Sequence, residues 1–175
     1  MLALHAYWGK KTLILGDVNS GKTQMTLELL ALIRDRERRK VAVLDFAPEK
    51  TRDIGGKMAV PSDPFVFYYT TKIIPPRLTG RNSTEAEAYA SQNAKAIDVL
   101  FVRYMKNPRS LLIINDVSLY LQMGDLRRLL DVLRPSHTVI INGYYGITLG
   151  DSALSKRERE QMDRLAQACD QVIHL

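Results

Sequence analysis

The chain has 175 residues and 46% hydrophobic residues, which fits one globular domain with a buried core and excludes two full-sized ones. It carries 25 Lys and Arg against 19 Asp and Glu, a formal charge of +6. A single cysteine, Cys169, excludes an internal disulfide and a cysteine-based zinc site. No apolar run approaches the roughly 18 residues that a membrane helix needs, and the first residues lack the plan of a secretory signal. We therefore expect a cytoplasmic protein with no membrane partner.

Short apolar runs alternate with helical patterns along the chain. In chain order, the patterns predict a strand over 11–15, a helix over 22–34, a strand over 41–44, a strand within 65–74, a helix over 84–106, a strand over 111–114, a helix over 119–133, a strand over 139–141, a helix over 155–168 and a strand over 172–175. Thr84 and Glu87 have the spacing of a capping box, and Ser155 is the expected N-cap of the last helix. Strands separated by helices predict a single domain, residues 1–175, of the α/β class, with a mostly parallel sheet between two helical layers (αβα).

A glycine-containing segment between the first strand and the first helix is the sharpest pattern. It fits G-x-x-x-x-G-K-[ST], and its residues are Gly16, Asp17, Val18, Asn19, Ser20, Gly21, Lys22 and Thr23. We expect the two glycines to permit backbone angles that a side chain forbids, so that N–H groups surround phosphate oxygens at a helix N-terminus. Lys22 is expected to neutralise the β- and γ-phosphates, and the Thr23 hydroxyl to bind Mg²⁺. The simpler alternative is a glycine-rich turn before a helix.

A second acidic position follows the most hydrophobic predicted strand. Residues 111–114 are all apolar, and Asn115 and Asp116 come next. A buried strand of this kind delivers a carboxylate to the carboxyl edge of the sheet, where ligands of open α/β folds bind. We therefore expect Asp116 to hold Mg²⁺ through water beside Thr23. The alternative is an acid in the turn that ends the strand.

Together these segments resemble the P-loop ATPases, and within them the RecA/KaiC-like branch. The resemblance implies a RecA-like core that binds ATP with Mg²⁺. Residues 139–142 are similar to the family's next strand, whose polar end senses the γ-phosphate, which implies that role for Asn142. An acid after the strand that follows the P-loop helix polarises the attacking water in this family. The matching stretch makes Glu49 the first candidate for the catalytic base and Asp45 the second, although the two acids are spaced more widely than in RecA.

Each of these catalytic candidates has an ordinary structural alternative. Asp45 can be a turn acid after a strand, Glu49 a solvated loop residue, and Asn142 the first residue of an Asn-Gly turn. The sequence therefore predicts a slow Mg²⁺-dependent ATPase, with a nucleotide-dependent regulatory or scaffold protein of negligible turnover as the alternative. Residues 20–23 and 48–52 also resemble the front half of thymidine kinases. That family has Asp-Glu after its second acidic strand and a cysteine-bound zinc, whereas this chain has Asp116-Val117 and one cysteine.

Basic residues and loops suggest where a partner could dock. Residues 34–40 contain five bases, which suit a helix C-terminus, and the segment from Lys72 to Arg81 has no acid. The loop from Gly143 to Gly150 corresponds to the DNA-contacting loop of RecA-like proteins but contains no base, so a nucleic-acid partner is not supported there. We expect a protein partner or a second copy of the chain to dock on the segment from Lys72 to Arg81 or on the loop from Gly143 to Gly150. Candidates for an arginine that reaches a neighbour's nucleotide are Arg127, Arg128, Arg157 and Arg159.

Overall fold

The computed structural model describes residues 4–37, 40–50 and 56–175, with side chains from residue 5 to 33 in the first range. Within these residues one parallel sheet has the strand order β3-β2-β4-β5-β1-β6. In chain order the strands are β1 (Lys11–Gly16), β2 (Val41–Asp45), β3 (Val66–Thr70), β4 (Leu111–Asn115), β5 (Thr138–Tyr144) and β6 (Gln171–His174). The helices are α1 (Lys22–Glu37), α2 (Pro76–Thr79), α3 (Ser83–Met105), α4 (Ser118–Leu121), α5 (Leu126–Leu133) and α6 (Ala153–Gln167), with a short 3₁₀ turn at Leu4–Ala6.

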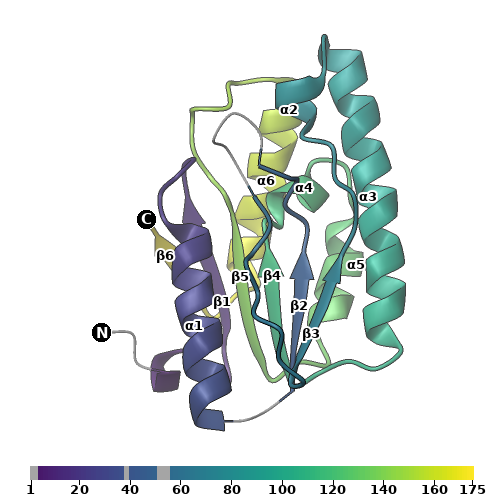
Figure 1. Cartoon of the computed structure of the whole chain (residues 1–175). Coiled ribbons are helices and arrows are strands. Elements are labelled where there is room, and N and C mark those ends of the chain that lie inside the picture. Colours follow the sequence, from purple (N-terminus) through teal and green to yellow (C-terminus); the bar gives the residue numbers. More distant parts are fainter. Residues whose placement is uncertain (1–3, 38–39, 51–55) are drawn as a thin grey trace.

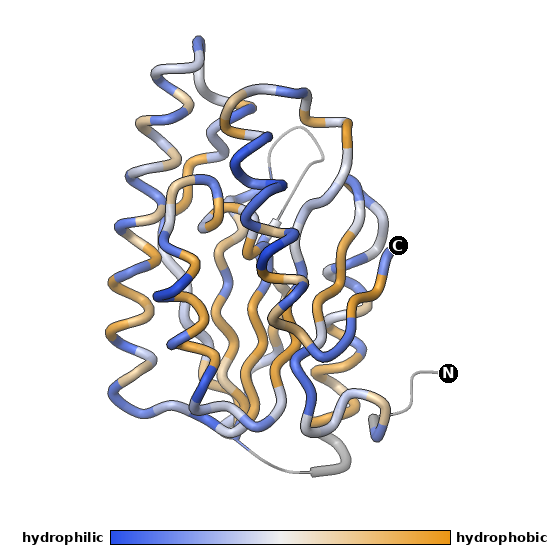
Figure 2. Tube along the Cα trace, turned by 180° about the vertical axis from the view of Figure 1, so that it is seen from behind, coloured by the Kyte–Doolittle hydropathy of each residue, from blue (hydrophilic) through white to orange (hydrophobic). Residues whose placement is uncertain are grey.

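Helices cover both faces of the sheet, as Figure 1 shows, with α1 on one face and α3, α5 and α6 on the other. Alternate residues of each central strand enter two separate cores. On β4, Leu112 and Ile114 pack with α3 to α6, whereas Leu111 and Ile113 pack with α1. Figure 2 shows the resulting apolar strands between the more polar outer surfaces of the helices. The predicted α/β class, the αβα layers and the parallel sheet are confirmed.

The register of the strands brings the predicted site residues to one edge of the sheet. Asp45 is paired with Asn115 across β2 and β4, and Gly16 with Tyr144 across β1 and β5. Because β5 lies between β1 and β4, Asn142 lies between the phosphate loop and the residues that follow β4. In open α/β sheets, ligands bind beyond the carboxyl ends of the strands, at the place where the strand order reverses.

The predicted helix over residues 119–133 is wrong, because two helices, α4 and α5, occupy this segment. Gly124, a residue of low helix propensity, lies at the break. A Cβ on Gly124 would lie 2.6 Å from the Tyr120 carbonyl oxygen, so the chain passes too close for a side chain. Asp125 then caps α5 by accepting a hydrogen bond from the Arg127 N–H at 2.9 Å.

Two predicted helix caps are also wrong, each by a few residues. Asn82, and not Thr84, caps α3 by accepting the Glu85 N–H at 2.9 Å, and the Glu85 carboxylate accepts the Arg81 N–H at 2.7 Å. Ser152, and not Ser155, caps α6. The short α2 was not predicted, although Pro76 at its first position is a known helix starter. None of the helices among the described residues is both long enough and apolar enough to cross a membrane.

Candidate functional site

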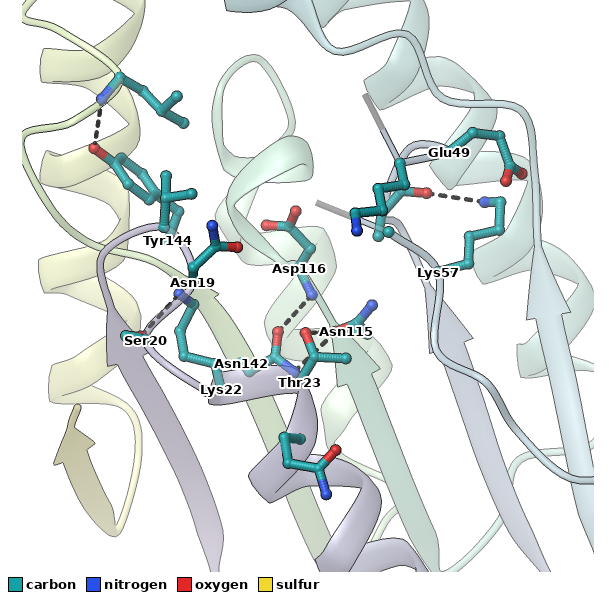
Figure 3. A pocket seen from close by; sticks show the side chains of 17 residues that line it. Asn19, Ser20, Lys22, Thr23, Glu49, Lys57, Asn115, Asp116, Asn142 and Tyr144 are labelled. Atoms are coloured by element: carbon teal, nitrogen blue, oxygen red, sulfur yellow. Dashed lines mark hydrogen bonds between the residues drawn. The ribbon is translucent and has the colours of Figure 1, made fainter. Parts of the chain in front are cut away.

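A cavity of about 660 Å³ opens at the carboxyl edge of the sheet, within the size range of small-molecule sites. The phosphate loop and the start of α1 form one wall of the cavity. Figure 3 shows Glu49 and Lys57 on the opposite wall, and Asp116 between the two walls. The lining residues are Val18, Asn19, Ser20, Gly21, Lys22, Thr23, Gln24, Ala47, Glu49, Lys50, Gly56, Lys57, Asn115, Asp116, Asn142, Tyr144 and Leu149. The structure therefore brings the phosphate loop, Asp116, Asn142 and Glu49 to one cavity.

The two glycines of the phosphate loop serve different purposes. Gly21 has φ +91°, a conformation that favours glycine, as predicted. Gly16 does not have a positive φ, so the predicted reason is wrong for this residue. It is required for space instead, because a Cβ there would clash with the Ser20 hydroxyl and lie 2.8 Å from the Leu175 carbonyl oxygen. With the loop turned in this way, the N-terminus of α1 faces the cavity and offers N–H groups to an anion.

Lys22 lies over its own loop. Its ammonium donates to the Asp17 carbonyl oxygen and, at 3.3 Å, to the Ser20 hydroxyl. Burial lowers the pKa of Lys22, and the nearby carboxylates of Asp116 and Asp17 oppose this shift. Both acceptors are neutral oxygens, so a phosphate in the cavity would offer this cation a stronger partner.

Asn115 contacts Thr23, a role that the sequence analysis did not assign. The Thr23 hydroxyl donates to Asn115 Oδ1 at 3.3 Å, and Asn142 Nδ2 donates to the same oxygen at 2.9 Å. Asn142 Nδ2 also donates to Thr26 Oγ1 at 2.9 Å, while its Oδ1 accepts the Asp116 N–H at 2.8 Å. Both amide hydrogens of Asn142 are therefore committed to protein oxygens.

Asp116 follows Asn115 with φ 59°, an uncommon angle for a residue other than glycine. Its carboxylate accepts a hydrogen bond from the Ser118 hydroxyl and is half-buried. Burial raises the pKa of Asp116, and the Ser118 hydrogen bond and the Lys22 charge act against this rise. Asp116 thus presents a carboxylate to the same cavity as Lys22.

Asp45 and Glu49, the two candidates for the catalytic base, have opposite environments. Asp45 is 0% exposed and does not line the cavity. Its carboxylate accepts four hydrogen bonds, from Ala47 N at 3.0 Å, Met58 N at 2.6 Å, Asn115 Nδ2 at 2.8 Å and the Tyr68 hydroxyl at 2.7 Å. Glu49 is exposed and lines the cavity. Of these two acids, only Glu49 is placed to meet water that enters with a ligand.

The oxygen atoms around Thr23 suit a hard cation. A hydroxyl and a carboxylate, from Thr23 and Asp116, line the cavity, and the Asn115 amide oxygen, which already accepts two hydrogen bonds, supports Thr23. No group of three or more His, Cys, Asp or Glu residues that could hold a metal occurs in the part of the chain that the structure describes. This donor set fits Mg²⁺ that arrives with phosphate groups, since Mg²⁺ is usually bound by few protein ligands together with substrate phosphates and water.

Asp17 connects the phosphate loop to the loop from Gly143 to Gly150. Its Oδ2 accepts the N–H groups of Ile147 at 3.1 Å and Thr148 at 3.4 Å, and its Oδ1 accepts the Val18 N–H at 2.6 Å. The Val18 hydrogen bond is the main cause of a lowered Asp17 pKa. A Cβ on Gly146 would clash with this carboxylate, so the two loops are in close contact.

The two tyrosines of the loop from Gly143 to Gly150 and the arginine candidates are largely engaged within the chain. The Tyr144 hydroxyl accepts the Leu149 N–H at 3.0 Å, and the Tyr145 hydroxyl donates to Asp163 at 2.9 Å. Among the arginine candidates with described contacts, Arg128 pairs with Asp98 at 2.8 Å, Arg157 donates to the Gly124 carbonyl oxygen at 3.5 Å and Arg159 to that of Gly146 at 2.9 Å. The basic residues 34–39 lie outside the described side chains.

Arg77, in the acid-free segment from Lys72 to Arg81, is a structural residue. Its guanidinium pairs with Glu158 at 2.9 Å, and the two side chains are 10% and 4% exposed. Arg77 also donates to the Ser155 hydroxyl at 3.2 Å, and Gln122 donates to Glu158 at 2.7 Å. Arg77 therefore has no free guanidinium to offer a partner.

A scan against protein-family models found no match, and neither did a search of curated proteins. Among solved structures, the Pif1 helicase from Candida albicans is 16% identical with a TM-score of 0.41, and the Hef helicase domain of Pyrococcus furiosus is 14% identical with a TM-score of 0.43. The alignments cover 95% and 98% of this chain, which spans only 36% of each helicase chain. A likeness this distant gives no information on the ligand or the activity.

The Arg77–Glu158 pair gives a stability prediction. Arg77→Met should lower the free energy of unfolding by about 3–5 kcal/mol at pH 8, above the Glu158 pKa that burial raises to about 7, because it leaves a buried carboxylate without its cation. The double variant Arg77→Met/Glu158→Gln should recover most of that loss. Arg81→Met is the control, since Arg81 pairs with Glu85 at an exposed site and should matter much less. Urea unfolding measures all three, and equal losses for Arg77→Met and Arg81→Met would contradict the assignment.

Proposed function

We propose that this chain is a P-loop ATPase domain of the RecA/KaiC-like branch, spanning residues 1–175, that binds ATP with Mg²⁺ and hydrolyses it slowly. The observation that carries the proposal is the cavity itself, where the N-terminus of α1 and Lys22 face Asp116 and Glu49. An anion site next to two carboxylates suits a phosphate chain, a metal ion and an attacking water. A cytoplasmic location, where ATP is available, is part of this proposal.

The phosphate loop, residues 16–23, would hold the triphosphate. Lys22 would exchange the Asp17 carbonyl and the Ser20 hydroxyl for β- and γ-phosphate oxygens. Thr23 already donates its hydroxyl proton to Asn115, so its lone pairs remain available for Mg²⁺. Asp116 would hold the metal through water. Bound Mg²⁺ supplies charge neutralisation of the phosphate oxygens.

Glu49 would orient the attacking water, from the wall of the cavity opposite the phosphate loop. Asp45 is not part of this proposal as a base, because four hydrogen bonds occupy its buried carboxylate. Asn142 would act on the γ-phosphate site indirectly. With both amide hydrogens committed, it holds Asn115 and the Asp116 backbone in place.

A regulatory protein with negligible turnover is the second candidate, and the neutral Asn115 beside Thr23 favours it. An amide gives Mg²⁺ less electrostatic stabilisation than a carboxylate at the same place would give. Phosphate release at saturating ATP separates the two candidates, since release no faster than in buffer favours the regulator. Equal yields of ADP and phosphate would also exclude transfer to an acceptor, the reaction that the thymidine-kinase resemblance implies.

The loop from Gly143 to Gly150 is the proposed docking site for a protein partner or a second copy of the chain. Ile147 in this loop is 82% exposed, and the neighbouring backbone is bonded to Asp17 of the phosphate loop. A nucleotide that changes the hydrogen bonds of Asp17 would therefore alter this loop. This loop contains no base, so a nucleic-acid partner is not part of the proposal at this site.

Nucleotide binding is tested by Lys22→Ala. The variant should fold as the parent does, because the described hydrogen bonds of the Lys22 ammonium go only to its own loop. It should lose at least about 10-fold in ATP affinity through the lost phosphate contacts. Calorimetric titration with ATP and Mg²⁺ measures the change. Lys95→Ala, at an exposed position of α3, is the matched control. A folded Lys22→Ala protein with the affinity of the parent would contradict the proposal.

Hydrolysis is tested by Glu49→Gln. Loss of the water-orienting carboxylate should lower the rate of phosphate release by about 100-fold, with ATP affinity nearly unchanged. Glu87→Gln, at an exposed position of α3 away from the cavity, should leave the rate as in the parent. A Glu49→Gln protein that releases phosphate at the parental rate would remove Glu49 from the mechanism.

A further inference from the structure

Asp45 and Thr23 are linked through a single amide. Asn115 Nδ2 donates to Asp45 Oδ1 at 2.8 Å, and the Thr23 hydroxyl donates to Asn115 Oδ1 at 3.3 Å. Asp45 and Asn115 are also register partners on β2 and β4. The buried carboxylate and the hydroxyl at the start of α1 are therefore the two ends of one short hydrogen-bond chain.

The direction of this chain is determined by Asp45. An ionised carboxylate can only accept hydrogen bonds, so the NH₂ group of Asn115 must face it. The Asn115 carbonyl oxygen then faces Thr23 and also accepts from Asn142 Nδ2 at 2.9 Å. With the amide reversed, the NH₂ groups of Asn115 and Asn142 would face each other, and one buried donor would lose its acceptor. Thr23 is thus held as a donor toward Asn115.

The residue that bonds to Thr23 is uncharged, and the nearest negative charge in this hydrogen-bond chain is one residue further away, on Asp45. Asn115 is neutral, and the carboxylate immediately behind it is that of Asp45. A second carboxylate at position 115 would lie at hydrogen-bond distance from Asp45 in a buried place, where two negative charges repel strongly. The fold can therefore accommodate an acid at position 45 with an amide at position 115, or an amide at position 45 with an acid at position 115.

We propose that Asp45 is a positioning residue of the nucleotide site. It fixes the Asn115 amide, holds the Thr23 hydroxyl ready for Mg²⁺, and supplies from behind the negative charge that Asn115 lacks. This inference rests on the proposed function, because it assigns Mg²⁺ to Thr23. It replaces the role of catalytic base that the sequence suggested for Asp45.

The test compares Asp45→Asn, Asn115→Asp and the exchange variant Asp45→Asn/Asn115→Asp. Each is unfolded by urea without nucleotide, and each is titrated with ATP in Mg²⁺ and in EDTA. We call the ratio of ATP affinity in Mg²⁺ to that in EDTA the Mg²⁺ effect. Asp45→Asn should reduce this ratio about 10-fold, as expected for a residue behind a metal ligand. ATP affinity in EDTA should stay within about 2-fold of the parent, because the phosphate loop is unchanged.

The exchange variant should regain the Mg²⁺ effect, because it again has one acid and one amide, now with the acid beside Thr23. It should remain somewhat less stable than the parent, since the Ala47 N–H loses its carboxylate acceptor. Asn115→Asp alone should be the least stable of the three, because two buried carboxylates face each other. If Asp45→Asn does not fold, Asn115→Ala breaks the same chain and should show the same loss of the Mg²⁺ effect.

Tyr68→Phe is the matched control. It removes a 2.7 Å hydrogen bond from the same carboxylate, at Oδ2, the oxygen that does not bind Asn115, and Tyr68 does not line the cavity. It should lower stability without reducing the Mg²⁺ effect. The proposal would be overturned if Tyr68→Phe reduced the Mg²⁺ effect as much as Asp45→Asn does. It would also be overturned by an exchange variant that folds but does not regain the Mg²⁺ effect.

A parent protein that binds no ATP would overturn the proposed function and, with it, the magnesium role of Asp45. Unfolding without nucleotide distinguishes that failure from failure of the hydrogen-bond chain. An exchange variant more stable than both single variants would still support the fixed polarity of the Asp45–Asn115 pair. If Asp45→Asn, Asn115→Asp and the exchange variant were equally unstable, the fixed polarity of this pair would be contradicted.

Discussion

The carboxylate of Asp45 has no contact with solvent, and this single buried charge organises the carboxyl edge of the sheet. A buried carboxylate is tolerated only when donors surround it. Those donors come from the exit of β2, from the segment before β3, from β3 itself and from β4, through Ala47, Met58, Tyr68 and Asn115. Asn115 and Asn142 extend the network to α1 and β5. The wall of the cavity therefore depends on one acid that does not face it.

The other wall is joined to the loop from Gly143 to Gly150. The Tyr145 N–H donates to the Gly16 carbonyl oxygen at 2.9 Å, and Asp17 accepts from the backbone of Ile147. Lys22 in turn bonds to the carbonyl oxygen of Asp17. A phosphate that draws Lys22 away changes the surroundings of the residue that holds this loop. Under the proposed function, Asp17 would thus link the nucleotide site to the loop from Gly143 to Gly150.

The sequence predicted the features that depend on local spacing. The strands and the layers follow from apolar runs that alternate with helical patterns, and the position of the phosphate loop follows from a motif of eight residues. The space that requires Gly16 depends in part on Leu175, 159 positions along the chain, and Arg77 meets Glu158 from 81 positions away. Such contacts have no local signal. Asn115 was missed because a neutral amide after a strand does not stand out, although its position opposite Asp45 in a parallel pair could have revealed it. The break between α4 and α5 had a local signal, Gly124 followed by Asp125, that the helical periodicity outweighed.

The central claim is that the cavity binds a nucleoside triphosphate through the phosphate loop, with Mg²⁺ at Thr23. A crystal structure with a non-hydrolysable ATP analogue and Mg²⁺ measures this directly. Lys22 should then contact phosphate oxygens in place of the Asp17 carbonyl, Thr23 should bind the metal while it still donates to Asn115, and Glu49 should be the carboxylate nearest the attacking water. A triphosphate bound elsewhere, with Lys22 still on Asp17, would contradict the account.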